Sequence, residues 1–548
     1  MVNIIRKKII EKKYIEKILM IFLIIQPILD LYFLFDEKIV NLFGFSPSTI
    51  IRIFFVGVLG ILFLIVLKNK KEIYLYLIYI ILITIYAIFH HINALNFTNY
   101  YNGYDFGYTL LGELFYIIRM LMPLFLIIVS SHYEFKDKQI EKIVRILILI
   151  ICGSIIVTNI LELSTGSYSK EIIKGNILCW FKSDRCNLNY MDLASKGLFL
   201  DPNRLSALLV LLTPLTYYIL FRNPGIFNKI IIIINILGMF MLGTKVSTYG
   251  TIIILILSII IYLFFSFIKK ELKFKHSICI FLIFLLIFTI LMIPYSPAVN
   301  RTFVDKTIHN NYNSNNDGQL KENEIKENAL TEQIKQEFES QHTDEDTEEL
   351  DINAILGKMT KKEKDKFLIK FVEDNYLNYN LNYHFVYNSY PYTYDAEFWY
   401  KVMNLSIEER TNFRTIERMM LDRVKTINNN KYDDYLGITF SRMGNIFDLE
   451  RDFLSHYYTL GIIGLLLLIS PYIIIVLICI IKILINFKQK FNLKNICYLM
   501  GIGITLFASY YTGNVMDGLI VTLILGFCIG QLINESFNLK NQIQEAKK

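Results

Sequence analysis

The chain has 548 residues, of which 54% are hydrophobic and only 19% are charged, and its formal net charge is +7. Soluble proteins carry about a quarter charged residues, so this composition excludes a soluble enzyme, a fibrous chain and a disulfide-rich secreted module. The hydrophobic residues are concentrated in blocks of about 20, the length of a helix that crosses a bilayer. The sequence therefore predicts a polytopic membrane protein, whose positive charge reflects topology and not nucleic-acid binding.

Twelve blocks have the length and apolar content of membrane-spanning helices, so the predicted fold class is all-α with about twelve spans. In chain order the blocks cover residues 15–35, 48–67, 73–90, 110–130, 143–162, 199–220, 228–243, 248–267, 276–294, 457–481, 493–511 and 515–534. Only the short polar sequence GTKVST separates the seventh block from the eighth. This spacing predicts a tight helical hairpin.

Positively charged residues gather in alternate loops. They occur near both chain ends and in the segments 68–71, 136–145, 222–229, 268–275 and 482–494. The opposite short loops carry few of them, and 91–109 contains no Lys or Arg. Because membrane proteins keep Lys and Arg in cytoplasmic loops, both termini are predicted to be cytoplasmic, which agrees with an even number of spans.

A large polar insertion divides the chain into three predicted domains. The N-terminal membrane domain covers 1–294, the extracytoplasmic domain covers 295–456, and the C-terminal membrane domain covers 457–548. Within the insertion, 306–350 is rich in Asn, Glu, Gln and Lys and poor in apolar residues, so it is predicted to be flexible.

A second polar segment, 163–198, lies on the same predicted outer side. It contains Cys179 and Cys186, which can pair if the segment faces an oxidising space and otherwise stay reduced. The sequence leaves both possibilities open.

Aromatic residues and a basic stripe mark the second half of the extracytoplasmic domain. Segment 366–400 is crowded with Tyr, Phe and Trp, which fit either glycan binding or the domain's own core. Segment 406–427 has apolar residues at spacings of three and four, which predicts one amphipathic helix. Arg410, Arg414 and Arg418 form a second stripe on this helix at spacing four.

Charged residues inside apolar blocks are costly, so each one is a candidate functional residue. The outer halves of the blocks contain Asp30, Arg52, His90, His91, Glu113, Arg119, Asp201, Arg204 and Lys245. Together these residues are predicted to form an outward-facing pocket with several cations, which suits a phosphate-bearing ligand. Structural alternatives stay open: Arg52 and Lys245 as interface anchors, Arg119 paired with Glu113 or another carboxylate, and Asp201 or Asn203 as a helix cap.

Two carboxylates, Glu450 and Asp452, precede the tenth block on its predicted outer side. Acidic residues stabilise helix N-termini, so capping is one interpretation, and general-base catalysis beside a cationic pocket is the other. The sequence has no cluster with metal-ligand spacing and no phosphate-binding Gly loop, so neither a metal nor a cofactor is expected.

The membrane portion resembles the O-antigen ligase and Wzy-type polysaccharide polymerase family in its Gram-positive-like form. Four stretches carry the resemblance: QPILD in the first block, GLFLDPNRLSALLVLLTPL in the sixth, LGTKVST at the hairpin, and ERDFLSHYYTLGIIG at the tenth. The family has a large late outer loop followed by a helix with the pattern H-N-D-Y-L-x(6)-G-x-x-G. The matching positions are Asp452, Phe453, Leu454, Gly461 and Gly464. Glu450 stands where the family's ligase has His.

The resemblance implies a membrane-embedded glycosyltransferase of the C type in the bacterial cytoplasmic membrane. Such an enzyme joins a glycan held on undecaprenyl pyrophosphate to a glycan acceptor outside the membrane, with inversion and without a metal. The implied partners are the lipid-linked donor, the acceptor, the lipid bilayer and other polysaccharide-assembly proteins.

The same resemblance, together with the predicted pocket, assigns roles to individual residues. Pyrophosphate binding falls to Arg204, Lys245, Arg414, Arg119 and Arg52. Supporting roles fall to Asp201, Asn203, Glu113 and Arg410. The catalytic base is Glu450 or Asp452, whereas His456 lies off the motif position and receives no role.

Two other functions compete with this interpretation. A flippase for lipid-linked oligosaccharides, or another polysaccharide transporter, would also suit twelve spans and a basic cavity. The large outer insertion and the lack of a detectable repeat between the two halves argue against it. A non-catalytic scaffold would leave the charged residues of the spans unexplained.

Overall fold

The computed structural model describes residues 2–35, 46–67, 70–98, 106–304, 356–357, 359–446 and 449–537. Regular structure in these ranges is helical, and extended segments there meet only as isolated bridges. The predicted all-α fold class is therefore confirmed. The segment 306–350, predicted to be flexible, lies outside the described residues.

Ten helices in the described part of the chain are long and apolar enough to cross a membrane. They are α3 (Pro47–Val66), α4 (Lys70–Leu95), α5 (Leu110–Ser131), α6 (Asp137–Ile160), α8 (Pro202–Arg222), α10 (Lys245–Leu263), α11 (His276–Met292), α20 (Asp452–Gly464) with α21 (Ser470–Ile485), α23 (Leu493–Tyr511) and α24 (Leu519–Phe537). The first and seventh predicted spans correspond to α1 (Val2–Ile24) and the shorter α9 (Ile226–Leu242). The polytopic membrane class is thus supported, and the count of twelve spans stays a prediction.

The first block departs from its predicted helix. α1 ends at Ile24, and two short 3-10 turns, η1 (Ile28–Asp30) and η2 (Tyr32–Phe35), replace the expected helical end. Pro27 precedes these turns and lacks the N–H that a continuing helix needs. The backbone freed from the helix pairs instead with the segment before α8: the Tyr32 N–H donates to the Leu198 carbonyl over 2.9 Å. Two of the motif stretches are therefore direct neighbours.

The centre of the bundle consists of α8 and α24. Of their most apolar stretches, 94% and 83% of the residues are buried, compared with 22% in α3 and 17% in α4. α24 packs along α5, and α8 packs along α23. The close approach of α24 to α5 depends on small residues, because a Cβ at Gly526 of α24 would lie 2.6 Å from the Pro123 carbonyl oxygen of α5. Polar residues at the ends of α8 and α24 are consequently held inside the protein.

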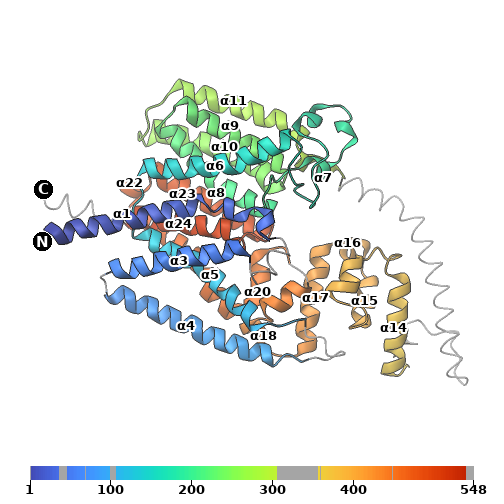
Figure 1. Ribbon diagram of the computed structural model, residues 1–548. Coiled ribbons are helices and arrows are strands. Elements are labelled where there is room, and N and C mark those ends of the chain that lie inside the picture. The colour runs from blue at the N-terminus through green and yellow to red at the C-terminus, as the bar shows by residue number, and fades with distance from the viewer. Residues whose placement is uncertain are drawn as a thin grey trace, which may run out of the picture.

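Two polar segments lie at one end of the bundle. The segment around α7 (Tyr190–Leu193) contains a disulfide between Cys179 and Cys186, which answers the question that the sequence left open. The helices α14 to α17 project from the same end, and α1 begins at the opposite end (Figure 1). Both polar segments therefore share one end of the bundle, and the assignment of that end to the outer face of the membrane stays a prediction.

The part of the chain from Lys361 to Ile446, here called the outer domain after its predicted location, is built from short helices around an aromatic core. Its elements are α14 (Lys361–Asn375), the π-turn η7 (Phe385–Ser389), α15 (Ala396–Met403), α16 (Ile407–Arg410), α17 (Phe413–Asn428), α18 (Asp433–Leu436) and α19 (Phe440–Ile446). Most aromatic residues of 366–400 are buried in this core, including Trp399 and Tyr390. The Trp399 Nε1–H donates to the Tyr390 carbonyl over 2.7 Å. For these residues the core interpretation holds.

The prediction of a single helix over 406–427 is wrong. α16 ends at Arg410 and α17 begins at Phe413, with Thr411 and Asn412 between them. Ser406 and Glu409 form a capping box that starts the short first helix, and Asn412 adopts an extended conformation before the second. The arginine stripe is therefore divided, with only Arg414 and Arg418 on α17.

The two glycines of the G-x-x-G motif permit close packing against α20. Gly461 has φ +67°, and a Cβ there would lie 2.3 Å from the carbonyl carbon of Tyr435 in α18. Gly464 leaves room for Tyr86 of α4, whose hydroxyl donates to the Leu460 carbonyl over 2.8 Å. Both glycines thus join the outer domain and α4 to the C-terminal bundle.

Replacing Gly461 with Ala is expected to destabilise this junction. Positive φ costs a non-glycine residue about 1–3 kcal/mol, and the contact with Tyr435 adds a steric penalty. The measurement is the thermal unfolding temperature of the detergent-solubilised protein. Gly503→Ala is the matched control, because a Cβ at Gly503 meets nothing within 4 Å. Equal unfolding temperatures for the two variants would contradict the role assigned to Gly461.

Candidate functional site

A cavity of about 1320 Å³ lies where the outer domain meets the end of the bundle. Its basic lining residues are Lys245, Arg301, Arg414, Arg418 and Arg451, and its acidic ones are Glu417, Asp422 and Glu450. Three of the predicted site residues, which are far apart in the sequence, therefore line the same cavity: Lys245, Arg414 and Glu450. The excess of cations over carboxylates makes the cavity suitable for an anionic ligand.

Arg414 and Glu450 form an ion pair across the cavity. The Arg414 Nε–H donates to Glu450 Oε2 over 2.7 Å, and a second guanidinium nitrogen bonds to the same oxygen. The two side chains are 37% and 39% exposed, so the pair is open to solvent and contributes little to stability. Glu450 Oε1 takes no part in these bonds and can meet a ligand in the cavity.

Asp452 occupies a different position from Glu450. It is the first residue of α20 and only 1% exposed, and it does not line the cavity. Its carboxylate accepts the backbone N–H groups of Val515 over 3.0 Å and Met516 over 2.7 Å. The structure therefore favours Asp452 as a residue that holds the loop between α23 and α24, and favours Glu450 as the one available for chemistry.

The loop 512–518 contacts several residues of the predicted site. Gly513 allows the backbone of Glu450 and Arg451 to approach, since a Cβ there would lie 2.4 Å from the Arg451 nitrogen. Asn514 lines the cavity. The twelfth predicted span begins at 515, but α24 begins at Leu519 because the preceding N–H groups bond to Asp452.

Arg204 does not line the cavity and is linked to it only through this loop. Its Nε–H donates to the Asn514 carbonyl over 3.2 Å, and it lies 3.8 Å from Asp201. Asp201 caps α8 by accepting the N–H groups of Asn203 over 2.7 Å and Arg204 over 3.2 Å. Asp201 thus acts as the helix cap that the sequence allowed, and the cap holds Arg204 beside the cavity.

Three arginines gather within the bundle beside the loop. Arg52 is only 2% exposed, which excludes an interface anchor, and its Nε–H donates to Gln26 Oε1 over 2.8 Å. Arg52 is near enough to Arg119 and Arg204 to repel both, and Asp30 lies 3.7 Å away as a counter-charge. Arg119 donates to the Asp517 carbonyl over 2.9 Å. Asp30 beside Arg52 and Asp201 beside Arg204 supply counter-charges, so this cluster is largely balanced by its own carboxylates.

Glu113 supports the outer domain and not Arg119. Its carboxylate accepts the N–H groups of Phe440 over 3.0 Å and Ser441 over 2.7 Å at the start of α19. His90, also buried, lies 3.2 Å from the same carboxylate. The suggested pairing of Arg119 with Glu113 is therefore wrong, because the Glu113 carboxylate bonds instead to N–H groups at the start of α19.

Arg410 does not belong to the cavity. It is 8% exposed and donates to the Met403 carbonyl over 2.9 Å, at the end of α15. Its guanidinium also lies 5.3 Å from the centroid of the Tyr379 ring, and burial lowers its pKa. Arg410 thus stabilises the outer domain at a distance from the predicted ligand.

Several cavity residues escaped the sequence assignment. Arg301 lies beyond α11, where its guanidinium stacks 4.7 Å from the Tyr168 ring. Arg418 was visible in the basic stripe, and Arg451 adjoins Glu450 in the motif. No sequence signal places Asn514 beside them. In the described residues no group of three or more His, Cys, Asp or Glu side chains is arranged to hold a metal.

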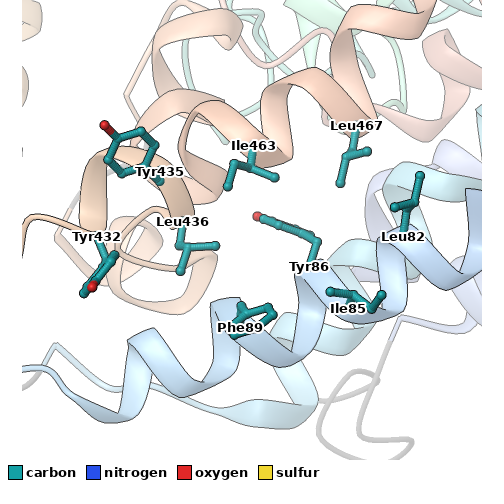
Figure 2. Close-up of a pocket in the computed structure, with 9 residues that line it drawn as sticks. All are labelled: Leu82, Ile85, Tyr86, Phe89, Tyr432, Tyr435, Leu436, Ile463 and Leu467. Atoms are coloured by element: carbon teal, nitrogen blue, oxygen red, sulfur yellow. The ribbon is translucent and has the colours of Figure 1, made fainter.

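An apolar groove of about 490 Å³ opens on the side of the bundle. Figure 2 shows the side chains of α4 facing those of α18, of α20 and of η8 (Leu465–Ile469) across it. The lining residues are Leu82, Ile85, Tyr86, Phe89, Tyr432, Tyr435, Leu436, Ile463 and Leu467. α20 therefore begins beside the cationic cavity and contributes further along to a groove suited to a hydrocarbon chain.

Comparison with known proteins identifies the family. The sequence family described as O-antigen ligase like membrane protein matches residues 12–538. No curated protein and no solved structure matches the chain. The family match includes all four motif stretches, the cavity and the groove. The chain therefore belongs to the family of O-antigen ligase-like membrane proteins.

Proposed function

We propose that this protein transfers or polymerises a glycan carried on undecaprenyl pyrophosphate at the outer face of the bacterial cytoplasmic membrane. Family membership supports a role in polysaccharide assembly and a membrane glycosyltransferase class. The cavity is the observation that carries the finer proposal. Four separate chain segments bring Lys245, Arg301, Arg414, Arg418 and Arg451 to one space.

The basic residues stabilise the leaving group. When the bond between the glycan and the lipid diphosphate breaks, negative charge grows on the diphosphate. Arg414 and Lys245 contribute fixed positive charge inside the cavity, and Arg204 contributes it from the adjoining edge at Asn514. Guanidinium groups match phosphate oxygens with paired hydrogen bonds. The lipid diphosphate leaves with the bonding electron pair.

Glu450 acts as the general base. It accepts the proton of the acceptor hydroxyl through Oε1 while that oxygen attacks the anomeric carbon from the face opposite the diphosphate. One glycosidic bond forms as the sugar–phosphate bond breaks, so the anomeric configuration inverts. Arg414 holds Glu450 through Oε2 and links the base to the anion site. Asp452 positions the supporting loop.

The lateral groove holds part of the polyprenyl chain in this proposal. Its lining is almost wholly apolar, and exposed Phe89, Tyr432 and Tyr435 form its outer edge. A hydrocarbon chain in the groove exchanges lipid contacts for protein contacts, which fixes the diphosphate near the cavity and lowers the entropy cost of reaction.

Replacing Ile463 with Trp is expected to fill the groove and raise the KM for the lipid-linked donor by about tenfold, which corresponds to about 1.4 kcal/mol of lost packing contacts between the polyprenyl chain and the groove. The kcat is expected to change little. Ile462→Trp is the matched control, because Ile462 adjoins Ile463 on α20, is 43% exposed and does not line the groove. Equal KM values for both variants would show that the polyprenyl chain of the donor does not bind in this groove.

Reconstitution tests the proposed function directly. The protein in liposomes is mixed with undecaprenyl-pyrophosphate oligosaccharide and acceptor, and the products are separated by size. New glycosidic bonds with release of undecaprenyl pyrophosphate are expected. A ladder of products identifies a polymerase, and one transferred block identifies a ligase. Translocation of the donor without any new bond would overturn the proposal in favour of a flippase.

A further inference from the structure

A group of tyrosines in the outer domain remains outside its core. Tyr376, Tyr383 and Tyr387, here called the tyrosine platform, are half-buried or exposed, and Tyr383 is 57% exposed. The rings of Tyr383 and Tyr387 are stacked, with centroids 4.5 Å apart and planes inclined by 18°. The Tyr376 ring lies 5.3 Å from that of Tyr387. The planes of Tyr376 and Tyr387 are inclined by 68°, so the three rings form a packed aromatic cluster in which Tyr383 is the most exposed.

The platform is fixed to the core beneath it. Phe385 and Val386 of the π-turn η7 are buried. They anchor the chain between the two stacked tyrosines. Tyr392 is also buried, with its ring 5.0 Å from that of Tyr387. A rigid aromatic surface exposed to solvent is unusual and commonly marks a binding site.

The platform adjoins the cationic cavity. The Phe385 ring lies 5.3 Å from the ring of Phe413, and Phe413 lines the cavity at the start of α17. The segment that carries the platform is thus packed against a residue of the cavity wall. A chain-like ligand whose reacting end lies in the cavity can extend past Phe413, which is 52% exposed, towards the platform.

We propose that the tyrosine platform binds sugar units of the glycan chain outside the cavity. This inference rests on the proposed function. Flat aromatic rings pack against the C–H faces of sugar rings, and the tyrosine hydroxyls bond to sugar hydroxyls at the edges. Polar side chains on the same segment add further partners: Glu373 lies beside Tyr387, and Asn388 bonds to His384 over 3.0 Å.

The composition of the platform favours a glycan over a protein or a lipid. Its three rings each carry a hydroxyl, and acidic, amide and imidazole groups lie on the same segment. A lipid surface would favour aliphatic residues and Lys or Arg beside them. The platform lies in the domain that projects beyond the end of the bundle (Figure 1).

The test measures binding of free oligosaccharide to the full-length protein in nanodiscs. The probe is the repeat-unit oligosaccharide released by mild acid from the host strain's surface polysaccharide. Saturation-transfer NMR reports contacts between aromatic protons and sugar protons, and titration gives the affinity. The Tyr383→Ala/Tyr387→Ala variant is expected to lose these contacts and to bind about tenfold more weakly. The Tyr383→Phe/Tyr387→Phe variant is expected to keep the ring contacts.

Tyr14→Ala/Tyr74→Ala is the matched control, because these tyrosines are 60% and 64% exposed and lie on α1 and α4. It is expected to bind like the wild type. Unchanged binding by the platform variant, or no binding by the wild type, would overturn the platform. Loss of a co-purifying protein with intact oligosaccharide binding would also overturn it. Failure of the proposed function is distinguishable, because it appears as absence of transfer by the wild type in the reconstituted assay.

Discussion

Replacing Arg204 with Ala is expected to abolish glycan transfer while the protein still inserts into the membrane. Arg204 bonds to the Asn514 carbonyl and lies beside Arg52 and the cavity, so its removal takes away charge that stabilises the departing diphosphate. Removal of one preorganised donor from such a site lowers kcat by about 10²–10³. The measurement is the initial rate of the reconstituted reaction at saturating donor.

Arg222→Ala provides the control for Arg204. It lies at the other end of the same helix, α8, and pairs with Glu271 away from the cavity. Arg204→Lys separates charge from shape: partial activity is expected because the ammonium keeps the charge and loses the paired geometry. A rate for Arg204→Ala close to that of the wild type would remove Arg204 from the site.

Replacing Glu450 with Gln is expected to lower kcat by about 10²–10⁴, the usual contribution of a general base. The amide cannot accept the acceptor's proton, although it keeps the size of the side chain and one oxygen near Arg414. The KM for the donor is expected to change little because the cationic residues remain. The measurement is the steady-state rate across donor concentrations.

Glu397→Gln is the control for Glu450, since Glu397 is an ion-paired carboxylate of the outer domain outside the cavity. Asp452→Asn separates the two candidate bases. Because Asp452 accepts the N–H groups of Val515 and Met516, its variant is expected to lower the unfolding temperature as well as the rate. Loss of activity in Asp452→Asn with unchanged stability, and full activity in Glu450→Gln, would reverse the assignment.

The sequence predicted the helical fold well because hydrophobic blocks of membrane length are a strong physical signal. Local deviations arose where tertiary contacts decide the backbone. Pro27 turns the chain towards Leu198, and Asp452 holds the residues before Leu519 out of helix. Each of these contacts joins residues that are far apart in the sequence, so no local sequence pattern predicts it.

The site was predictable in part. Lys245, Arg414 and Glu450 line one cavity, and the sequence marks them by a cation at the edge of a span, a basic stripe and an acidic helix start. Their roles stay a prediction. The sequence did not distinguish residues that only stabilise the structure from residues that line the cavity. Arg410 and Arg414 look equivalent at spacing four, yet a break at Thr411 and Asn412 sends the first into the outer domain.

Binding of a prenyl diphosphate tests the central claim most directly, because that claim is a cationic cavity that holds a diphosphate. Farnesyl diphosphate and farnesyl monophosphate are titrated into the reconstituted protein at low and high salt. The account predicts tighter binding of the diphosphate, weakening with salt and about tenfold or greater loss in Lys245→Ala/Arg414→Ala. Equal affinity of the wild type and this double variant for the diphosphate would contradict it.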